Sequence, residues 1–359
     1  MKAAVCHQFG APLGGEDVAL RGPGPGEIEV KTAACAICHS DIAYGNGDWG
    51  GGLPLVLGHE ASGHVVAVGD GVSGYRPGQP VLVTLIRACG TCAACAEDNP
   101  TSCDKAWDSY ASPLTTRDGA PLGQGLKTAA FAERMVVHTS QCTPLPPDMD
   151  LVTASLLACG VITGFGAVTN SARLQPGQSA VVIGAGGVGI NAIQGAALAG
   201  ARPLVAVDIS DARLTDAKRF GATHGVLAGQ PSTVAEVRAA TPASRGVDFA
   251  FVSVGKAEVM AEAIDMLAPG GAVVLVGIPP TGASISVDPS VIASMNQRII
   301  GSRMGQTLLR RDVPALIEHY RAGRLKLDEL VTARWQLSEI NEALSHTRAG
   351  KALRNVIVF

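Results

Sequence analysis

QSAVVIGAGGVG, residues 178–189, joins a short apolar run to a glycine-rich turn. Residues 180–183 are continuously apolar, which predicts a buried strand of a parallel sheet. The glycines that follow have the spacing G-x-G-x-x-G, and INAIQGAALAG then continues with a helical pattern to Gly200. A second apolar run, LVAVD, ends at Asp208, about 20 residues beyond the last glycine of the turn. Strand, glycine turn, helix, strand and acid in this order predict a dinucleotide-binding βαβ unit.

The glycine turn also predicts where a dinucleotide would bind. Where side chains are missing, the backbone amides at a helix N-terminus can approach a pyrophosphate closely. The predicted cofactor contacts in the turn are Gly184, Gly186, Gly187, Val188 and Gly189.

Asp208 predicts which cofactor is used. Its carboxylate would accept hydrogen bonds from both ribose hydroxyls of NAD and would repel the 2′-phosphate of NADP. Arg213, on the next predicted helix, could reach the adenosine ribose. Asp208 has an alternative role as the N-cap of that helix, because Asp is a favoured capping residue. Its place at the end of a strand favours the ribose role.

The rest of the chain surrounds this unit with two kinds of pattern. After residue 160, the apolar runs VVIG, LVAVD, GVDFAFVSVG and AVVLVGIP alternate with helical segments, which predicts an α/β fold with a doubly wound parallel sheet. Before it, short alternating strands such as EIEVK and VLVT are interrupted by many Gly and Pro residues, which predicts a β-rich domain. A chain of 359 residues is too long for one ordinary core, so we expect two domains.

Composition narrows the function classes. The chain is 47% hydrophobic and 16% charged, with a formal net charge of -3, which argues against binding nucleic acid because phosphates require a basic face. The N-terminus MKAAVCHQFG has no long apolar core, and we find no uninterrupted apolar run of about 18 residues, so neither a signal peptide nor a membrane span is predicted. We expect a cytoplasmic protein, in which cysteine clusters bind metals more often than they form disulfides.

ACGTCAACAEDNPTSC, residues 88–103, contains a cysteine cluster with the spacing C-x2-C-x2-C-x7-C. Four thiolates on tight turns can converge on one tetrahedral zinc and close a structural site. An iron–sulfur cluster is an alternative, although the bacterial ferredoxin spacing closes with x3 and a following Pro. Unrelated free cysteines are a second alternative. The predicted zinc ligands are Cys89, Cys92, Cys95 and Cys103.

A second set of metal-binding residue types is scattered along the chain. Cys38 lies in AACAICHSDIAYG, His59 in LVLGHEASGHVVAVG and Cys159 in SLLACGVITGFGAV. A Cys, a His and a Cys would give zinc three protein ligands and leave a fourth position open, which is the arrangement of a catalytic zinc. Spacing alone does not establish that Cys159 meets the other two.

The order of these motifs resembles that of the zinc-dependent medium-chain dehydrogenase family, in its alcohol dehydrogenase branch. The resemblance extends from Lys2 to the closing segment RNVIVF. It implies a GroES-like β-rich catalytic domain over residues 1–160, which carries both zinc sites and is completed by 304–359. It also implies a Rossmann NAD-binding domain over residues 161–303.

The resemblance implies roles for individual residues. Cys38, His59 and Cys159 would bind the catalytic zinc, with Glu60 beside the metal. Asp41 would orient the histidine, as carboxylates commonly do for metal-ligating imidazoles. Ser40 would contact the bound alcohol. The further residues implied to lie near the cofactor are Thr163 and Val276 at the nicotinamide, His39 at the pyrophosphate and Arg354 near the phosphates.

The sequence departs from the family at one step of proton transfer. Many members carry a histidine five residues after the first zinc ligand, whereas this chain has Ala43. Water or another group must then take the final proton. By family position, Trp49, Leu85 and Phe131 would line an apolar substrate pocket, and simple core packing is the alternative for each.

The implied reaction is reversible oxidation of a primary alcohol, aromatic or with a medium-length apolar tail, to its aldehyde. Hydride would pass from a zinc-bound alkoxide to NAD, with two zinc ions per subunit, one catalytic and one structural. Other substrates of the same family remain open, namely a polyol, a secondary alcohol or the thiol adduct of formaldehyde. A non-catalytic nucleotide-binding protein is a further alternative. We expect small-molecule substrates, no membrane partner, and a homodimer or homotetramer, since this family commonly forms them.

Overall fold

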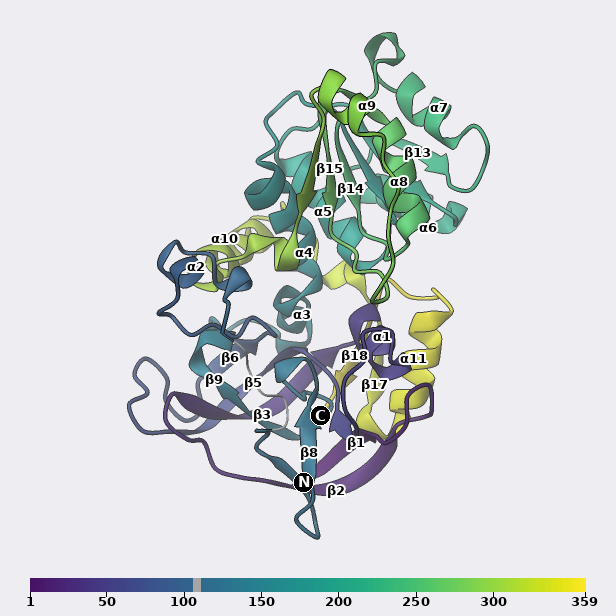
Figure 1. Ribbon diagram of the computed structural model, residues 1–359. Helices are drawn as coiled ribbons and strands as arrows, with labels where there is room; N and C mark the ends of the chain where they lie inside the picture. The colour runs from purple at the N-terminus through teal and green to yellow at the C-terminus, as the bar shows by residue number, and fades with distance from the viewer. Residues whose placement is uncertain (106–110) are drawn as a thin grey trace. The chain divides into compact units, whose positions relative to one another are not determined.

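The computed structural model describes residues 1–105 and 111–359 of the chain (Figure 1). They form two compact units. The first unit comprises Met1–Gly160, Leu308–Glu318 and Leu327–Phe359, and the second comprises Val161–Thr307 and His319–Lys326. The first unit therefore contains both ends of the chain.

The first unit is built from a small closed barrel and a larger sheet. The barrel has the strand order β1-β2-β7-β8-β4, and the sheet has the order β10-β6-β5-β3-β18-β17, with β9 pairing to β3. The barrel strands are β1 (Lys2–Cys6), β2 (Gly14–Leu20), β7 (Leu114–Thr116), β8 (Pro121–Gln124) and β4 (Leu55–Val56). The sheet strands are β10 (Cys142–Pro144), β6 (Pro80–Val83), β5 (Glu60–Val68), β3 (Glu27–Ala36), β18 (Arg354–Val358), β17 (Val331–Gln336) and β9 (Arg134–His138).

Short helices connect these strands. The α-helices are α1 (His39–Asn46), α2 (Ala93–Ala96), α3 (Leu151–Ser155) and α11 (Ile340–Arg348), and α10 (Leu309–Arg321) continues into the second unit. The 3-10 turns are Pro100–Ser102, Gly125–Lys127, Thr139–Gln141, Leu156–Ala158, Asp328–Leu330 and Leu337–Glu339.

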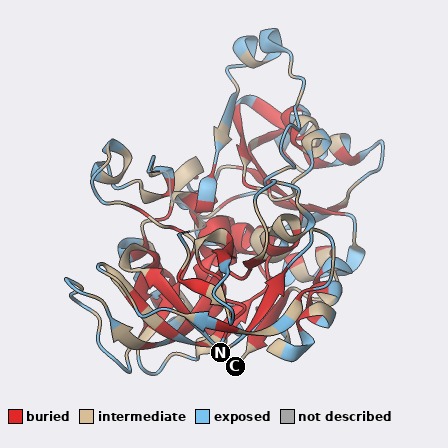
Figure 2. Ribbon diagram, turned by 60° about the horizontal axis from the view of Figure 1, so that its bottom comes forward, coloured by how far each residue is buried: buried red, intermediate tan, exposed pale blue. Residues whose placement is uncertain are grey.

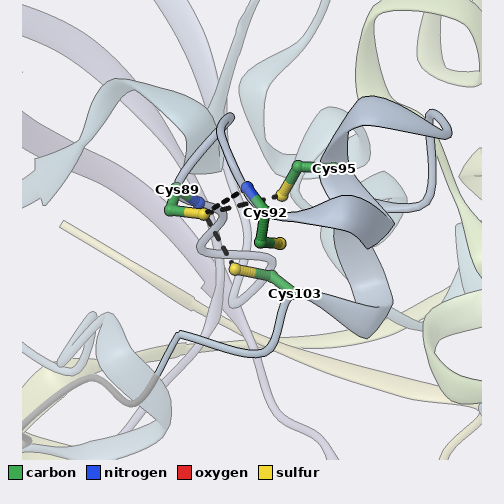
Figure 3. A group of neighbouring side chains, drawn as sticks. All are labelled: Cys89, Cys92, Cys95 and Cys103. Carbon is green, nitrogen blue, oxygen red and sulfur yellow. Dashed lines mark hydrogen bonds between the residues drawn. The ribbon is translucent and has the colours of Figure 1, made fainter.

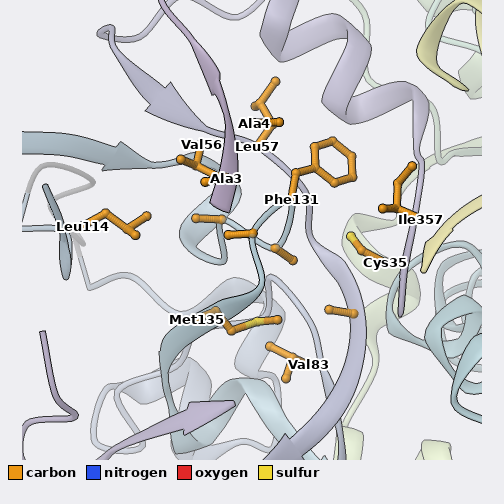
Figure 4. Packing of buried hydrophobic residues seen from close by; sticks show 14 of the residues in the cluster. Ala3, Ala4, Cys35, Val56, Leu57, Val83, Leu114, Phe131, Met135 and Ile357 are labelled. Atoms are coloured by element: carbon orange, nitrogen blue, oxygen red, sulfur yellow. The ribbon is translucent and has the colours of Figure 1, made fainter. Parts of the chain in front are cut away.

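The core of the first unit combines segments that are far apart in the sequence. Its buried cluster includes Ala4, Cys35, Phe131 and Ile357, which come from both ends and the middle of the chain (Figure 4). The last strand, β18, lies between β3 and β17, antiparallel to the first and parallel to the second. Burial of apolar side chains on both sides of the sheet therefore holds the C-terminal segment in the middle of the unit.

The second unit is an α/β domain with one parallel sheet. Its strand order is β13-β12-β11-β14-β15-β16, and every neighbouring pair in this order is parallel. The strands are β13 (His224–Leu227), β12 (Leu204–Asp208), β11 (Ala180–Ile183), β14 (Val247–Val252), β15 (Leu267–Leu275) and β16 (Arg298–Gly301). This confirms the predicted parallel sheet, and β11 and β12 are buried along their whole length, as their continuous apolar sequences predict (Figure 2).

Helices and turns link the parallel strands of this unit. The α-helices are α5 (Gly187–Leu198), α6 (Asp211–Arg219), α7 (Thr233–Ala239), α8 (Ala257–Asp265) and α9 (Pro289–Ser294), and α4 (Gly160–Gly166) begins at the boundary between the units. A π-helix spans Ala167–Ala172, and 3-10 turns span Pro242–Ser244 and Arg303–Gln306.

No single helix of the described chain is long and apolar enough to cross a membrane. One bent pair, Leu151–Ala158 with Gly160–Ala172, reaches the required length and composition taken together.

Candidate active site

The structure brings together the first candidate metal ligands in the first unit. Cys38 precedes α1, His59 and Glu60 stand at the start of β5, and Cys159 follows the turn Leu156–Ala158. Their ligand atoms all lie within 4.8 Å of one another, and all four residues are buried. A cluster of two sulfurs, an imidazole and a carboxylate at this separation can hold a zinc ion.

Asp41 determines which nitrogen of His59 faces this cluster. Its Oδ1 lies 2.9 Å from His59 Nδ1 and also accepts the Gly58 N–H at 3.0 Å. Its Oδ2 accepts the Cys38 N–H at 3.0 Å. Because an ionised carboxylate only accepts hydrogen bonds, Nδ1 carries the proton and Nε2 faces the cluster.

The atoms of the cluster fit a zinc ion. His59 Nε2 is buried and has no hydrogen-bond partner among the described residues, as expected for an atom that ligates a metal. Burial lowers the pKa of His59, but the charges of Asp41 and Cys38 outweigh it and hold the pKa well above its usual value. Hydrogen bonding from the Cys159 thiol, supported by His59 and opposed by burial, holds the pKa of Cys38 well below its usual value. The negative charge of the Cys38 thiolate favours the binding of a cation. The cation would displace protons from its ligands.

Gly58 is a site residue that the motif analysis missed. It has φ +89°, and a Cβ there would lie 2.5 Å from the backbone nitrogen of Phe131. Its N–H binds Asp41 and its carbonyl accepts the Ala130 N–H at 2.9 Å. Only glycine fits this close approach, which holds the residue before His59 in place. In the sequence, this role of Gly58 was indicated by a glycine directly before the His59-Glu60 pair.

Glu60 forms a buried ion pair next to the candidate ligands. Its Oε2 accepts a hydrogen bond from Arg354 Nη2 at 2.5 Å, and the Gly160 N–H lies 3.5 Å from the same oxygen. Burial raises the pKa of Glu60 to about 8, although the Arg354 guanidinium lowers it. Arg354, expected near the cofactor phosphates, is thus placed beside the metal cluster by the first unit, and the sequence did not indicate this pairing.

Two predicted site residues, His39 and Ser40, lie at the start of α1. His39 is its first residue and is exposed, and Ser40 follows it and is half-buried. Ala43, which replaces the family histidine, is also half-buried. The alcohol-contacting role of Ser40 and the pyrophosphate role of His39 stay predictions.

The second cysteine cluster is also assembled (Figure 3). Its four sulfurs lie within 4.8 Å of one another, with Cys89 Sγ 4.0 Å from Cys95 Sγ. The Cys89 sulfur accepts the backbone N–H groups of Thr91 at 3.5 Å and Cys92 at 3.4 Å. The hydrogen bonds from Thr91 and Cys92 lower the pKa of Cys89 to about 6. Four converging sulfurs with no open position fit a closed structural zinc site.

The second unit contains the predicted cofactor turn. Gly184 has φ +90°, and a Cβ at Gly189 would lie 1.7 Å from the Gly184 carbonyl oxygen. Helix α5 begins at Gly187 with Gly186 as its N-cap. The amides at the start of this helix are therefore accessible to a pyrophosphate without side-chain obstruction. Val188 lies in the first turn of α5.

Asp208 lies at the end of β12 and faces this turn. Its Oδ2 accepts the Ala185 N–H at 2.7 Å and its Oδ1 accepts the Ser210 N–H at 3.0 Å. Ser210 is the N-cap of α6, so the capping alternative for Asp208 is wrong. Arg213 Nη1 lies 3.0 Å from the position of a Cβ at Gly186, which places its guanidinium against the turn.

The residues predicted at the nicotinamide and in the substrate pocket are buried or half-buried. Thr163 is buried, and its Oγ1 lies 3.6 Å from Met304 Sδ, while Val276 is buried directly after β15. Trp49 is half-buried, and its ring stacks on Tyr44 with centroids 6.5 Å apart. Leu85 is half-buried, and Phe131 is fully buried in the core of the first unit (Figure 4). Their roles at the nicotinamide and in a substrate pocket stay predictions.

The chain is similar to known proteins over its whole length. The family described as "Zinc-binding dehydrogenase" matches residues 187–322, and the "Alcohol dehydrogenase GroES-like domain" matches residues 24–147. The chain is similar to the NDMA-dependent alcohol dehydrogenase of Amycolatopsis methanolica, with 34% identity over 99% of this chain and 98% of the relative. It is similar to the S-(hydroxymethyl)glutathione dehydrogenase of Paracoccus denitrificans, with 32% identity over 100% and 99%.

A solved structure agrees with these matches. The benzyl alcohol dehydrogenase of Acinetobacter calcoaceticus has a TM-score of 0.93 and 30% identity, covering 100% of this chain and 99% of its own. The family and the GroES-like and Rossmann-type fold predicted from the motifs are thereby confirmed. The chain belongs to the zinc-binding alcohol dehydrogenase family and is an oxidoreductase.

Proposed function

We propose that the protein reversibly oxidises primary alcohols with an aromatic or medium-length apolar tail to aldehydes, with NAD as the hydride acceptor. The observation that carries the proposal is His59 Nε2, which is buried without a hydrogen-bond partner among the described residues and belongs to the cluster of Cys38 and Cys159. A zinc ion held by these three residues would act as a Lewis acid that polarises the alcohol or carbonyl oxygen. A second zinc would occupy the four-cysteine cluster without taking part in the chemistry.

The residues of the first unit would position and deprotonate the substrate. Asp41 keeps His59 in the tautomer that presents Nε2. Ser40, half-buried and two residues from Cys38, would receive the proton of the alcohol. Ala43 carries no base, so that proton would pass from Ser40 to water. Glu60 and Arg354 would adjust the local charge next to the ligands.

The second unit would hold the cofactor. The amides of the glycine turn would bind the pyrophosphate, and Asp208 would accept hydrogen bonds from the adenosine ribose beside Arg213. Hydride transfer itself is the chemistry of the nicotinamide, and the protein would provide its position. The similarity to an NDMA-dependent relative makes cofactor choice the first control of any assay.

The tail of the substrate is inferred from residue types. Trp49, Leu85 and Phe131 are large and apolar, which would select by shape and burial. The similarity to a benzyl alcohol dehydrogenase supports an aromatic tail. The similarity to an S-(hydroxymethyl)glutathione dehydrogenase favours a second candidate, oxidation of the thiol adduct of formaldehyde.

We further infer a cytoplasmic homodimer or homotetramer. Strand β16 is the edge of the parallel sheet, and Ile299 on it is 40% exposed. An exposed edge strand offers unpaired backbone groups to a second copy. A monomeric mass in light scattering at micromolar protein would contradict this inference.

The test of the proposed function is the initial rate of NADH formation with different alcohols. Zinc-replete protein would be assayed with ethanol, hexanol, benzyl alcohol, cyclohexanol, sorbitol, and formaldehyde with glutathione, and with NADP as the cofactor control. We expect the highest rates with benzyl alcohol or hexanol and NAD. A rate confined to the glutathione adduct or to sorbitol would overturn the substrate assignment, and no rate with any alcohol would overturn the function.

A further inference from the structure

Asn355 is a buried polar residue that the proposed reaction does not use. It is 1% exposed and follows Arg354, the partner of Glu60, in β18. Its backbone carbonyl accepts the Ile37 N–H at 2.9 Å, one residue before Cys38. Asn355 therefore contacts the chain next to a candidate metal ligand. It is not itself one of the reacting groups.

The hydrogen bonds of its side chain hold the amide in one orientation. Trp335 Nε1 donates to Asn355 Oδ1 at 3.0 Å, and an indole nitrogen can only donate. His346 Nδ1 lies 3.1 Å from the same oxygen, so this nitrogen carries a proton. Asn355 Nδ2 donates to Thr347 Oγ1 at 2.7 Å, and the Thr347 hydroxyl donates to the Ala343 carbonyl at 2.8 Å. Because the Trp335 indole fixes Oδ1 as the acceptor, Nδ2 must be the donor to Thr347, and the Thr347 hydroxyl must donate onward to Ala343.

These partners connect β18 to two neighbouring elements. Trp335 lies on β17, while His346 and Thr347 lie on α11 (Figure 1). The pairing of β18 with β17 is irregular at this point, because Val331 is opposite Arg354 and Ala333 is opposite Asn355. On its other side β18 pairs regularly with β3, but that pairing starts only at Val356, one residue after Asn355. At Arg354 and Asn355 the strand therefore has the irregular pairing with β17 and the hydrogen bond from the Ile37 N–H to the Asn355 carbonyl.

Register decides where Arg354 points. Successive side chains of a strand point to opposite faces, so Asn355 faces α11 and Trp335 while Arg354 faces Glu60. A slip of one residue would turn Arg354 away from Glu60 and leave a buried carboxylate without its partner. The hydrogen bonds of the Asn355 amide connect the strand to β17 and α11 from its other face.

We propose that Asn355 is a positioning residue of the metal centre. Its amide, bound between Trp335, His346 and Thr347, holds the register of β18 that directs Arg354 to Glu60 beside the candidate ligands. The inference rests on the metal centre of the proposed function, but its test does not depend on which alcohol is oxidised.

The experiment measures cobalt bound at the metal centre of the full-length protein. Absorption spectra are recorded as Co²⁺ is added, and the spectrum of Cys38→Ser is subtracted to remove the signal of the four-cysteine cluster. Asn355→Ala removes the whole amide, and Trp335→Phe removes only the indole donor. If Asn355→Ala does not fold, Trp335→Phe provides the same test.

Asn341→Ala is the matched control. Asn341 is half-buried on the same helix, α11, and its amide makes two hydrogen bonds to the backbone of Leu13, at 2.8 and 2.9 Å. Its removal should destabilise the same unit without changing the register of β18. A general loosening of the first unit would affect both asparagine variants equally.

We expect Asn355→Ala to shift the cobalt spectrum and to weaken Co²⁺ binding about tenfold, as changes to groups around metal ligands commonly do. Trp335→Phe should shift the spectrum in the same direction by less, and Asn341→Ala should leave it unchanged. Wild-type spectra and affinities in both Asn355→Ala and Trp335→Phe would overturn the inference, as would an equal change in Asn341→Ala.

The outcomes also separate this inference from the proposed function. An active wild-type enzyme combined with unaltered cobalt binding in the Asn355 and Trp335 variants overturns the positioning role alone. A wild-type protein whose cobalt spectrum equals that of Cys38→Ser overturns the metal centre, and with it both proposals.

Discussion

His59 Nδ1 and Asp41 Oδ1 lie 2.9 Å apart, and both side chains are fully buried. The carboxylate also receives two backbone N–H groups, so three donors converge on it. This contact fixes the imidazole so that its other nitrogen faces the two cysteine sulfurs.

Asp41→Asn should weaken zinc at this centre about 10–100-fold, because groups that orient metal ligands have effects of this size. Asparagine has one acceptor oxygen, so its NH2 group must oppose an N–H that Asp41 now accepts. Competition with a chromophoric chelator measures the affinity. Unchanged affinity would show that the carboxylate does not hold the ring. Asp48→Asn, at an exposed position just after α1, is the control.

Cys38→Ala and Cys159→Ala should each remove one zinc per chain and lower turnover by about a thousandfold or more, since Lewis-acid polarisation is worth several kcal/mol. NAD binding should remain, because the glycine turn lies in the other unit. Elemental analysis, turnover and NADH fluorescence titration measure the three effects. Cys142→Ala, a buried cysteine outside both clusters, is the control. Near-normal rates in either ligand variant would refute the assignment.

Cys92→Ser should affect stability and leave the chemistry intact. A closed four-sulfur site contributes folding free energy, so its loss should lower the Tm by more than about 5 °C. Turnover per folded molecule at 25 °C should stay within about twofold. Thermal unfolding monitored by circular dichroism measures the shift. Ser102→Ala, exposed in the same loop, should not change the Tm. A large loss of turnover at full folding would contradict a purely structural role.

Asp208→Ala should raise the KM for NAD about 10–100-fold. The KM for NADP should fall relative to the KM for NAD. Hydrogen bonds to a charged group are worth about 1.5–3 kcal/mol, and removing the carboxylate also removes its repulsion of the 2′-phosphate. Asp211→Ala, exposed in the first turn of α6, should change neither value. An unaltered preference between the two cofactors in Asp208→Ala would contradict the ribose role.

His138 should make stability fall in mild acid. Burial, with help from Arg87, lowers the pKa of His138 below its usual 6.5. The unfolded chain then binds a proton that the folded chain does not, so this contribution is complete above pH 6.5 and is lost as pH falls from 6.5 towards the folded pKa. Urea unfolding at several pH values should show a weaker acid dependence in His138→Gln. His64→Gln, exposed on β5, should behave like the wild type.

The strength of local sequence patterns differed between the two units. The central strands of the parallel sheet were predictable because they are largely apolar runs, as β11 and β12 illustrate. The edge strands β13 (HGVL) and β16 (RIIG) include charged, polar or glycine residues and were not predicted. The first unit carries weaker signals, since its barrel strand β4 has two residues and β7 has three. Short strands of this kind depend on neighbours from distant parts of the chain.

The sequence by itself determined the four-cysteine cluster, the glycine turn and the acid that follows it, because each is a local spacing of residue types. Only the tertiary structure decided that Cys159 meets Cys38 and His59, that Arg354 pairs with Glu60, and that Ser210 and not Asp208 caps α6. The contact between Glu60 and Arg354 joins residues that are 294 positions apart. Packing of the sheets, and not local spacing, brings them within hydrogen-bond distance.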